Sequence, residues 1–350
     1  MQVTTSLPVT NLNQAAPAAQ AAEAAGFDGV ATMENSNNPF LPLAIAATTT
    51  KRVQLMTGIA IAFARSPMTV ANISHDLQLA SGGRFKLGLG SQVKGHNERR
   101  FSAPWTPPAP RLKEYVQSLR AIWRSWETGE PLNFTGDHYN FTLMTPHFVP
   151  ENTNLPMTPI TIAAVGPAML RVAGRYCDGA QLHPFCTRRY VEEVVMARIA
   201  EGMAQSKLTR ENFEISGGGF IVTGPDQETV DKIFEYVRYR VAFYGSTRAY
   251  WPVFEVHGLM DLGAKLHSLV KAGKWDDLAA EVSDDVVHLF AAVGRHDEIA
   301  SAIERRFGGV SDTVSAIAAP DATPDLTPDL VQDIQKIEST FKGFATSWQG

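Results

Sequence analysis

The sequence predicts an α/β fold of the TIM-barrel class, a (β/α)8 barrel that carries two insertions. Three observations predict it. Short apolar, β-branched stretches alternate with helical stretches, the pattern of parallel strands joined by right-handed helical crossovers. The stretch Val53–Ala62 is largely apolar, as expected for a strand buried on both faces. Eight such strands can be placed along the chain, the number that closes this barrel.

The alternation defines the expected elements in order. Strands are expected at Val3–Leu7, Asp28–Met33, Val53–Ala62, Phe85–Gly90, 159–164, 179–183, 213–223 and Val310–Ala318. Helices are expected at Gln14–Ala25, Pro39–Thr50, Ser66–Ala80, 109–127, 167–176, 188–206, 226–243, 296–307 and Asp329–Phe344. Gly26 and Gly82 follow two of the helices, where glycine takes the left-handed conformation without strain. A turn rich in Pro, Asp and Thr is expected at Pro320–Pro328.

Two segments interrupt the alternation and are interpreted as insertions on one domain spanning residues 1–350. Residues 129–157 contain FTGDHYNF, whose Gly136-Asp137 turn lies between aromatic-rich arms and predicts a hairpin. Residues 245–290 are amphipathic and helical in pattern, without a strand partner. An open doubly wound sheet of about ten strands is the alternative that the pattern leaves open.

Composition excludes several classes of protein. The chain has 350 residues, 44% of them hydrophobic, and a formal net charge of −5, so it can bury a large core and has no general attraction for nucleic acid or anionic membrane. No apolar stretch approaches the roughly 20 residues that span a bilayer. No signal peptide is recognisable, and Cys177 and Cys186 are the two cysteines. We therefore expect a cytoplasmic protein without disulfides.

Familiar nucleotide and metal motifs are absent. The segment Gly88–Lys94 follows an expected strand, but it has Val93 where the dinucleotide fingerprint requires glycine, and it does not match the P-loop pattern. The histidines show no HExxH or comparable spacing, so we expect no metal site.

In a TIM barrel the active site lies at the carboxyl ends of the strands. Glu34 lies at such an end and is a candidate functional residue. The alternative interpretation is structural, in which Glu34 pairs with an arginine. Gly58 interrupts an apolar strand, which marks a bulge or a close approach of backbone or ligand. Gly166-Pro167 opens a helix whose free N–H groups favour an anion. Lys94 and His96 belong to a basic cluster that follows the fourth expected strand. The cluster is either part of the site or an ordinary solvent-exposed face.

Three segments carry a resemblance to a known family: NPFLPLAIAATTT, LMTGIAIAFARSPMTVANISHDLQLASGGRFKLGLGSQVKGHNERRF and ITIAAVGPAMLRVAGRYCDGAQLHPF. They resemble the bacterial luciferase-like flavin monooxygenases, and more closely the actinobacterial branch that uses the deazaflavin coenzyme F420. The resemblance covers nearly the whole chain and implies a flavin-type cofactor lying over the strand ends.

The resemblance also implies roles for individual residues. Gly58-Ile59 matches a non-prolyl cis peptide whose bulge supports the central ring of the cofactor. Ala164, Val165 and Gly166 match the turn whose N–H groups hold the cofactor phosphate. Lys94 matches a basic residue that contacts this phosphate in flavin-mononucleotide (FMN) members.

The candidate catalytic residues are His96, Glu34 and Asn35. Histidine titrates near neutral pH without help, so His96 is the first candidate to move the proton that accompanies a hydride, and Glu34 the second. Asn35 stands where the related sugar-phosphate dehydrogenases carry a histidine. Because asparagine cannot take a proton, sugar-phosphate oxidation is disfavoured.

The sequence therefore predicts an F420-dependent oxidoreductase acting on an unidentified small organic molecule. One alternative is an FMN-dependent monooxygenase that uses oxygen and a partner reductase. A second is a non-catalytic barrel that binds the deazaflavin. Aromatic residues of the insertions suggest an apolar substrate, with ordinary core packing as the alternative. Helices 67–80 and 109–127 are candidates for a homodimer interface.

Overall fold

Parallel pairing joins eight strand positions into a closed ring. The computed structural model describes residues 1–315 and 326–345. Around the ring lie β1 (Gln2–Ser6), β2 (Gly29–Thr32), β3 (Gln54–Thr57) with its continuation β4 (Ala60–Ile61), β5 (Phe85–Gly90), β8 (Ile160–Ala164), β9 (Gly179–Leu182), β10 (Glu214–Gly217) and β13 (Thr313–Ser315). The ring closes because β13 pairs with β1 and β3 pairs with β5. The predicted TIM barrel is confirmed, and the open sheet is excluded.

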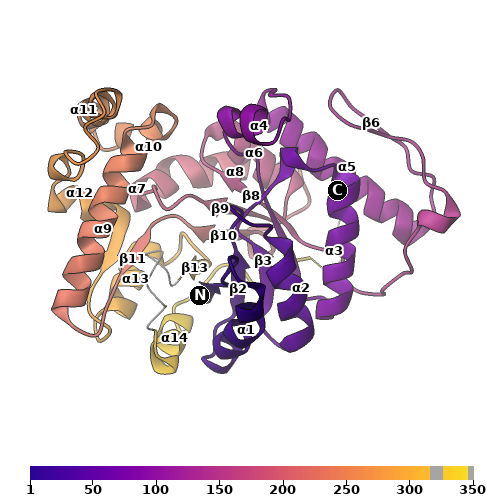
Figure 1. Cartoon of the computed structure of the whole chain (residues 1–350), viewed down its shortest axis with the longest axis horizontal. Coiled ribbons are helices and arrows are strands. Elements are labelled where there is room, and N and C mark those ends of the chain that lie inside the picture. The colour runs from indigo at the N-terminus through magenta and orange to yellow at the C-terminus, as the bar shows by residue number, and fades with distance from the viewer. Residues whose placement is uncertain (316–325, 346–350) are drawn as a thin grey trace.

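Helices surround the ring (Figure 1). They are α1 (Ala15–Ala24), α2 (Phe40–Thr49), α3 (Pro67–Ser81), α4 (Lys94–Arg100), α5 (Pro108–Thr128), α6 (Pro167–Tyr176), α7 (Arg188–Tyr190), α8 (Met196–Met203), α13 (Ile299–Phe307) and α14 (Pro328–Gln335). A π-helical turn, Val191–Val195, joins α7 to α8. Gly82 ends α3 with φ at +64°, which is the left-handed conformation that the sequence predicts there.

The two interrupting segments hold a hairpin and a group of helices. β6 (Phe134–Thr135) and β7 (Asn140–Phe141) pair antiparallel. The second segment contains α10 (Trp251–Glu255), α11 (Met260–Lys271) and α12 (Asp284–Phe290), which follow the long helix α9 (Gln227–Gly245). Figure 1 shows α9 to α12 together on one side of the barrel and the hairpin on the opposite side.

The predicted strand 213–223 is wrong as a single element. It divides after β10, where Gly217 and Gly218 have φ values of +77° and +94°, a region that only glycine enters without strain. The chain thereby turns out of the barrel into β11 (Phe220–Val222). This strand pairs in parallel with β12 (Ala291–Val293), which the sequence analysis did not predict.

The predicted strand Val53–Ala62 is interrupted at Gly58. Met56 pairs with Lys86 and Ala60 pairs with Leu89, so residues 57–59 face only residues 87 and 88. One extra residue is therefore accommodated in a bulge, which contains the cis peptide Gly58-Ile59. The bulge expected from this glycine is confirmed.

The predicted terminal helix, Asp329–Phe344, is too long. α14 ends at Gln335, and the chain then crosses the amino ends of the strands. Asp312 holds it there, because its carboxylate accepts hydrogen bonds from the Ser339 hydroxyl at 2.8 Å and the Phe341 N–H at 3.1 Å. Of the expected strand Val310–Ala318, residues 316–318 lie outside the described residues, as does most of the expected turn at Pro320–Pro328.

A buried ion pair spans the barrel interior near this end. Lys86 Nζ lies 2.6 Å and 2.8 Å from the two carboxylate oxygens of Glu214, and both side chains are 1% exposed. The Thr313 hydroxyl donates a further hydrogen bond to this carboxylate at 2.6 Å. These contacts satisfy charges that would otherwise be costly to bury.

We predict that Glu214→Leu lowers the free energy of unfolding by about 3–5 kcal/mol, because Lys86 is left buried without its partner. Adding Lys86→Met should recover most of that loss. The measurement is urea unfolding of the single and double variants. Glu228→Ala is the control, since the Glu228–Lys232 pair is exposed and should contribute less than about 1 kcal/mol. A loss no larger than the control's would contradict the prediction.

Candidate cofactor and substrate site

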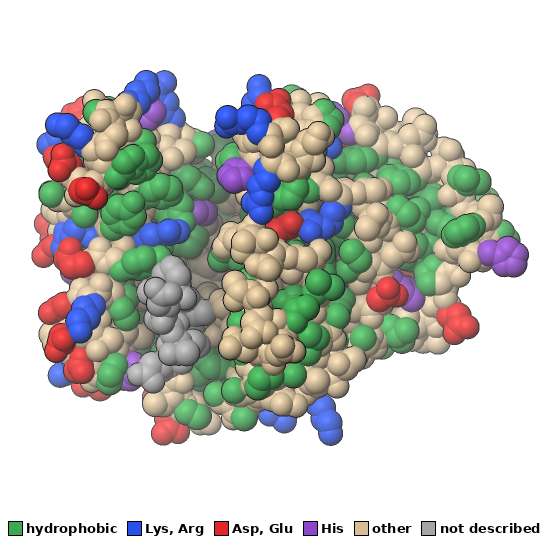
Figure 2. Space-filling view, viewed as in Figure 1, with side chains coloured by type: hydrophobic (Ala, Val, Ile, Leu, Met, Phe, Trp, Pro, Cys, Tyr) green, Lys and Arg blue, Asp and Glu red, His purple; other side chains and the backbone are tan. Residues whose placement is uncertain are grey.

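The residues predicted for the site lie at four neighbouring strand positions of the ring, β2, β3–β4, β5 and β8. They follow the carboxyl ends of these strands, where barrel active sites are built. In Figure 2 this part of the molecule is hollowed between the helical insertion and α4. The structure thus brings the predicted residues to one arc of the barrel mouth.

Glu34 is held in an ion pair. Its buried carboxylate accepts hydrogen bonds from both terminal nitrogens of Arg65, at 2.8 Å and 2.9 Å, and from the Ile61 N–H at 2.6 Å. The Arg65 guanidinium also lies over the Phe40 ring. A carboxylate that accepts hydrogen bonds from three donors has a fixed position. It ties the end of β2 to the chain that follows the bulge.

The bulge is supported from inside the barrel. The Thr57 hydroxyl donates to the Gly88 carbonyl at 2.7 Å and accepts from the Gly88 N–H at 2.8 Å. The Gln181 amide donates to the Thr57 carbonyl at 3.2 Å and to the Thr161 hydroxyl at 2.8 Å. Gly58 is half-buried above this network, so it forms part of a fixed floor that remains accessible.

Ile59 completes the floor by packing on Gly90. A Cβ atom at position 90 would lie 2.6 Å from the Cδ1 atom of Ile59, so glycine at this position lets the Ile59 side chain keep its place. Ile59 itself is half-buried. The floor formed by Gly58 and Ile59 is consequently apolar and partly accessible.

Helix α4 carries the basic cluster along the rim. His96 and Lys94 are exposed on it, and Lys94 lies 3.8 Å from Glu98. Asn35 is also exposed, and its backbone carbonyl accepts a hydrogen bond from Arg100. That contact joins α4 to the loop after β2, so His96, Glu34 and Asn35 come from neighbouring segments although their side chains form no direct bond.

The turn Ala164–Gly166 opens α6. Gly166 provides no side-chain cap and Pro167 has no N–H, so the first turn presents the free N–H groups of the next residues. The Tyr190 hydroxyl donates to the Val165 carbonyl at 3.1 Å and fixes the turn. Burial raises the pKa of Tyr190 to about 12, so the phenol remains protonated as a donor. Sequence reasoning missed Tyr190, because no motif marks it.

A group of polar and aromatic side chains, here called the α9 chamber, lies beside the carboxyl end of β9. It consists of His183, Arg240, Tyr244 and Tyr250. The His183 ring meets the Tyr244 ring edge-on at 4.4 Å and the Tyr250 ring at 4.7 Å between centroids. Its Nδ1 accepts a hydrogen bond from the Phe185 N–H at 3.0 Å. Sequence reasoning missed Arg240, because no motif marks it.

Burial, assisted by the positive charge of Arg240, lowers the pKa of His183 to about 4. The imidazole is therefore neutral at physiological pH. Since Nδ1 is an acceptor, the proton is on Nε2. The α9 chamber thus combines one cation with a neutral N–H donor and two phenols.

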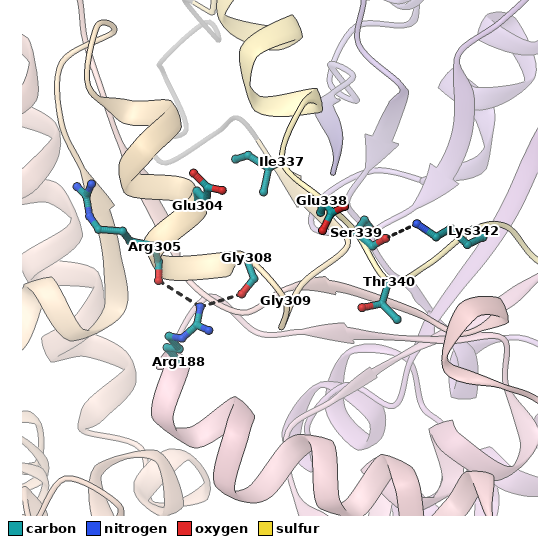
Figure 3. A pocket seen from close by; sticks show the side chains of 10 residues that line it. All are labelled: Arg188, Glu304, Arg305, Gly308, Gly309, Ile337, Glu338, Ser339, Thr340 and Lys342. Atoms are coloured by element: carbon teal, nitrogen blue, oxygen red, sulfur yellow. Dashed lines mark hydrogen bonds between the residues drawn. The ribbon is translucent and has the colours of Figure 1, made fainter.

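Two cavities lie away from the barrel mouth, and neither includes a predicted site residue. One, of about 610 Å³, is lined near the amino ends of the strands by Arg188, Glu304, Arg305, Gly308, Gly309, Ile337, Glu338, Ser339, Thr340 and Lys342 (Figure 3). There the Arg188 guanidinium donates hydrogen bonds to the backbone carbonyls of Arg305 and Gly308. The other, of about 400 Å³, lies between α3, α5 and residues 150–158.

The described part of the chain meets neither the requirements for a metal site nor those for a membrane-spanning helix. Residues 1–315 and 326–345 contain no group of three His, Cys, Asp or Glu side chains that could hold a metal ion. No helix among them is long and apolar enough to cross a membrane. Cys177 and Cys186 are both free and buried, and burial raises the pKa of each thiol.

Comparison with known proteins gives consistent matches. A family model described as luciferase-like monooxygenase matches residues 1–312. An uncharacterized protein of Mycobacterium tuberculosis is 45% identical over 306 residues, which cover 87% of this chain and 90% of that protein. A 5,10-methylenetetrahydromethanopterin reductase of Archaeoglobus fulgidus is 27% identical over 304 residues, covering 84% of this chain and 86% of the reductase.

A solved structure extends the comparison to three dimensions. The coenzyme F420-dependent tetrahydromethanopterin reductase of Methanopyrus kandleri has a TM-score of 0.73 to this chain at 19% identity. The match covers 96% of this chain and 97% of that one. At this identity the likeness establishes a shared fold.

We predict that His183 makes the protein less stable in mild acid. Between about pH 6.5 and pH 4 the unfolded chain binds a proton at this histidine and the folded chain does not, so stability falls as the pH is lowered. From about pH 7 to about pH 5 the wild type should lose about 2 kcal/mol more than His183→Asn, which keeps an acceptor near the Nδ1 position. Urea unfolding at both pH values measures this. His147→Asn, at an exposed histidine, should behave as wild type; equal losses in all three proteins would refute the assignment.

Proposed function

The chain belongs to the luciferase-like monooxygenase family, and on this premise we propose that it is a coenzyme F420-dependent oxidoreductase acting on a small organic substrate. When bound, the deazaflavin supplies the hydride chemistry. The observation that carries the proposal is the half-buried floor of Gly58 and Ile59, fixed from below and bordered by the start of α6. A flat ring fits the floor, and an anionic group fits the free N–H donors.

The residues of the floor and the α6 turn bind and orient. Ala164, Val165 and Gly166 would hold the cofactor phosphate, with Tyr190 fixing the turn. Lys94 and the neighbouring arginines of α4 are exposed cations that can attract the anionic tail. Relatives and solved neighbours whose names include F420 support the choice of this cofactor.

His96 is proposed as the residue that holds and moves the accompanying proton. It is exposed on α4 at the rim, where a substrate above the floor can reach it. Glu34 was the second candidate, but its ion pair with Arg65 supports a positioning part instead. Asn35 can donate or accept a hydrogen bond at the same rim without exchanging a proton.

An FMN-dependent monooxygenase with a partner reductase is the second candidate function. The family description itself favours it, and Lys94 could pair with a terminal phosphate. A non-catalytic deazaflavin-binding barrel is the third candidate, and it predicts binding without hydride exchange. For the oligomeric state, α3 and α5 are proposed as the helices of a homodimer interface.

We predict that the protein binds oxidised F420 at least about tenfold more tightly than FMN. Fluorescence titrations of the purified protein with each cofactor measure this. Tyr190→Phe should weaken F420 binding by about 2–10-fold, the value of one hydrogen bond, because the Val165 turn loses its anchor. Tyr239→Phe, on an exposed part of α9, is the matched control. Tighter binding of FMN would contradict the proposal and support the FMN-dependent monooxygenase instead.

We predict that His96→Ala lowers turnover by about 10²–10⁴-fold, the usual contribution of a positioned proton carrier, while the F420 dissociation constant changes less than about threefold. The assay uses a panel of ketones, alcohols and enones with F420 in the matching redox state. His147→Ala, at an exposed histidine beyond the hairpin, is the control. Unchanged turnover in His96→Ala would remove His96 from the catalytic residues.

A further inference from the structure

The α9 chamber holds a cation, Arg240, that is surrounded by the rings of Tyr236, Phe243 and Tyr244. Arg240 lies half-buried on α9, and its guanidinium stacks on the Tyr244 ring at 4.7 Å and donates to the Tyr244 hydroxyl. Two residues earlier, Arg238 is paired with Glu235 and Asp284. Among residues 1–315 and 326–345, the contacts of Arg240 are with aromatic side chains, and it forms no ion pair with an aspartate or glutamate. The guanidinium has five N–H donors in a planar fork, so it can still bind a planar anion that enters the chamber.

The surroundings of Arg240 also define the charge of the chamber. His183 is neutral, because burial and Arg240 oppose its protonation, and burial raises the pKa of Tyr250 to about 12. The chamber consequently carries a single positive charge. One guanidinium with an adjacent N–H donor and phenols matches a planar monoanion such as a carboxylate, which arginine can bind with two parallel hydrogen bonds.

Apolar surface surrounds the same opening. Tyr244 and Tyr250 are half-buried, so part of each ring is accessible. Across the barrel mouth, Met33 follows β2 with 54% of its surface exposed, and Val93 precedes α4 with 60% exposed. Exposed apolar side chains at a concave opening mark a binding surface for an apolar body.

We propose that the α9 chamber is the substrate-recognition subsite and that Arg240 binds a carboxylate on a substrate whose body is aromatic or otherwise apolar. This proposal rests on the proposed function for the identity of the reaction, since it names the substrate class of that site. Helix α9 and the segments packed on it then determine specificity, while the strand ends of the barrel hold the cofactor. Arg240 forms the charged contact, and the His183 Nε2–H donates to the same anion or to a neighbouring carbonyl oxygen.

The cofactor tail is a second source of carboxylate, and the experiment must separate the two sources. The probes are 2-naphthoate and its uncharged analogue 2-naphthamide, titrated into the full-length protein with and without saturating F420. Isothermal titration calorimetry gives both dissociation constants. F420 affinity is measured separately by fluorescence for every variant.

The wild type should bind naphthoate about tenfold more tightly than naphthamide, as one charged hydrogen-bonded pair provides. Arg240→Met should abolish this preference, leave naphthamide affinity within about twofold and leave F420 affinity within about twofold. Arg240→Lys, which retains the charge without the planar fork, should keep part of the preference and covers the case in which the methionine variant does not fold. Arg248→Met is the matched control, because Arg248 is exposed and stacks on Trp251; it should retain the full preference.

Two outcomes would overturn the proposal. The first is equal affinity for the two probes in the wild type, or a preference that survives in Arg240→Met. The second is a loss of F420 affinity above tenfold in Arg240→Met with the naphthoate preference intact, which would assign Arg240 to the cofactor tail. Binding of FMN in place of F420 with the preference intact would refute the proposed function but support the carboxylate subsite.

Discussion

One hydroxyl group allows the barrel to close around an interrupted strand. The bulge at Gly58 interrupts the backbone hydrogen bonds between β3 and β5. There the Thr57 hydroxyl accepts a hydrogen bond from the Gly88 N–H and donates one to the Gly88 carbonyl. A Cβ atom at position 88 would lie 1.9 Å from the Thr57 carbonyl oxygen, so only glycine permits this approach. The site depends on the same contact, because Gly58 and Ile59 reach the barrel mouth as part of a fixed structure.

The polar residues of the barrel itself are engaged in positioning. Glu34 forms an ion pair with Arg65, and the Gln181 amide donates hydrogen bonds to Thr57 and Thr161. Among the side chains proposed to meet a ligand, those on α4 and α9 belong to helices that lie beyond the strand ends. A rigid floor with adaptable groups above it is the usual arrangement in barrel enzymes, where loops vary the chemistry on a constant scaffold. The proposed reaction would therefore depend on residues outside the strands.

Local sequence pattern predicted the features that local interactions determine. β5 and α6 have the predicted bounds, and the bulge at Gly58 was expected from a glycine within an apolar run. Features that depend on distant partners were missed: β11 and β12 are three residues each and pair across about 70 residues of chain, and the terminal helix ends early because Asp312 binds the following segment. Likewise, Glu34 was identified as a site residue, whereas its partner Arg65, the Tyr190 anchor and the unpaired Arg240 became visible only when the chain was folded.

The distribution of charge along the arc from β2 to β9 explains how an acidic chain can attract anionic ligands. The protein carries a net charge of −5, yet within this arc Glu34 is paired with Arg65 and Glu98 lies against Lys94. The remaining arginines of α4, the free N–H groups of α6 and the cation of Arg240 follow one another along the barrel mouth. Because partly buried charges are screened less by salt than exposed ones, Arg240 and the N–H groups of α6 are the parts of this arc whose attraction for an anion should depend least on ionic strength. The two proposed anion sites, one at α6 and one at α9, would then lie beside the apolar residue Ile59.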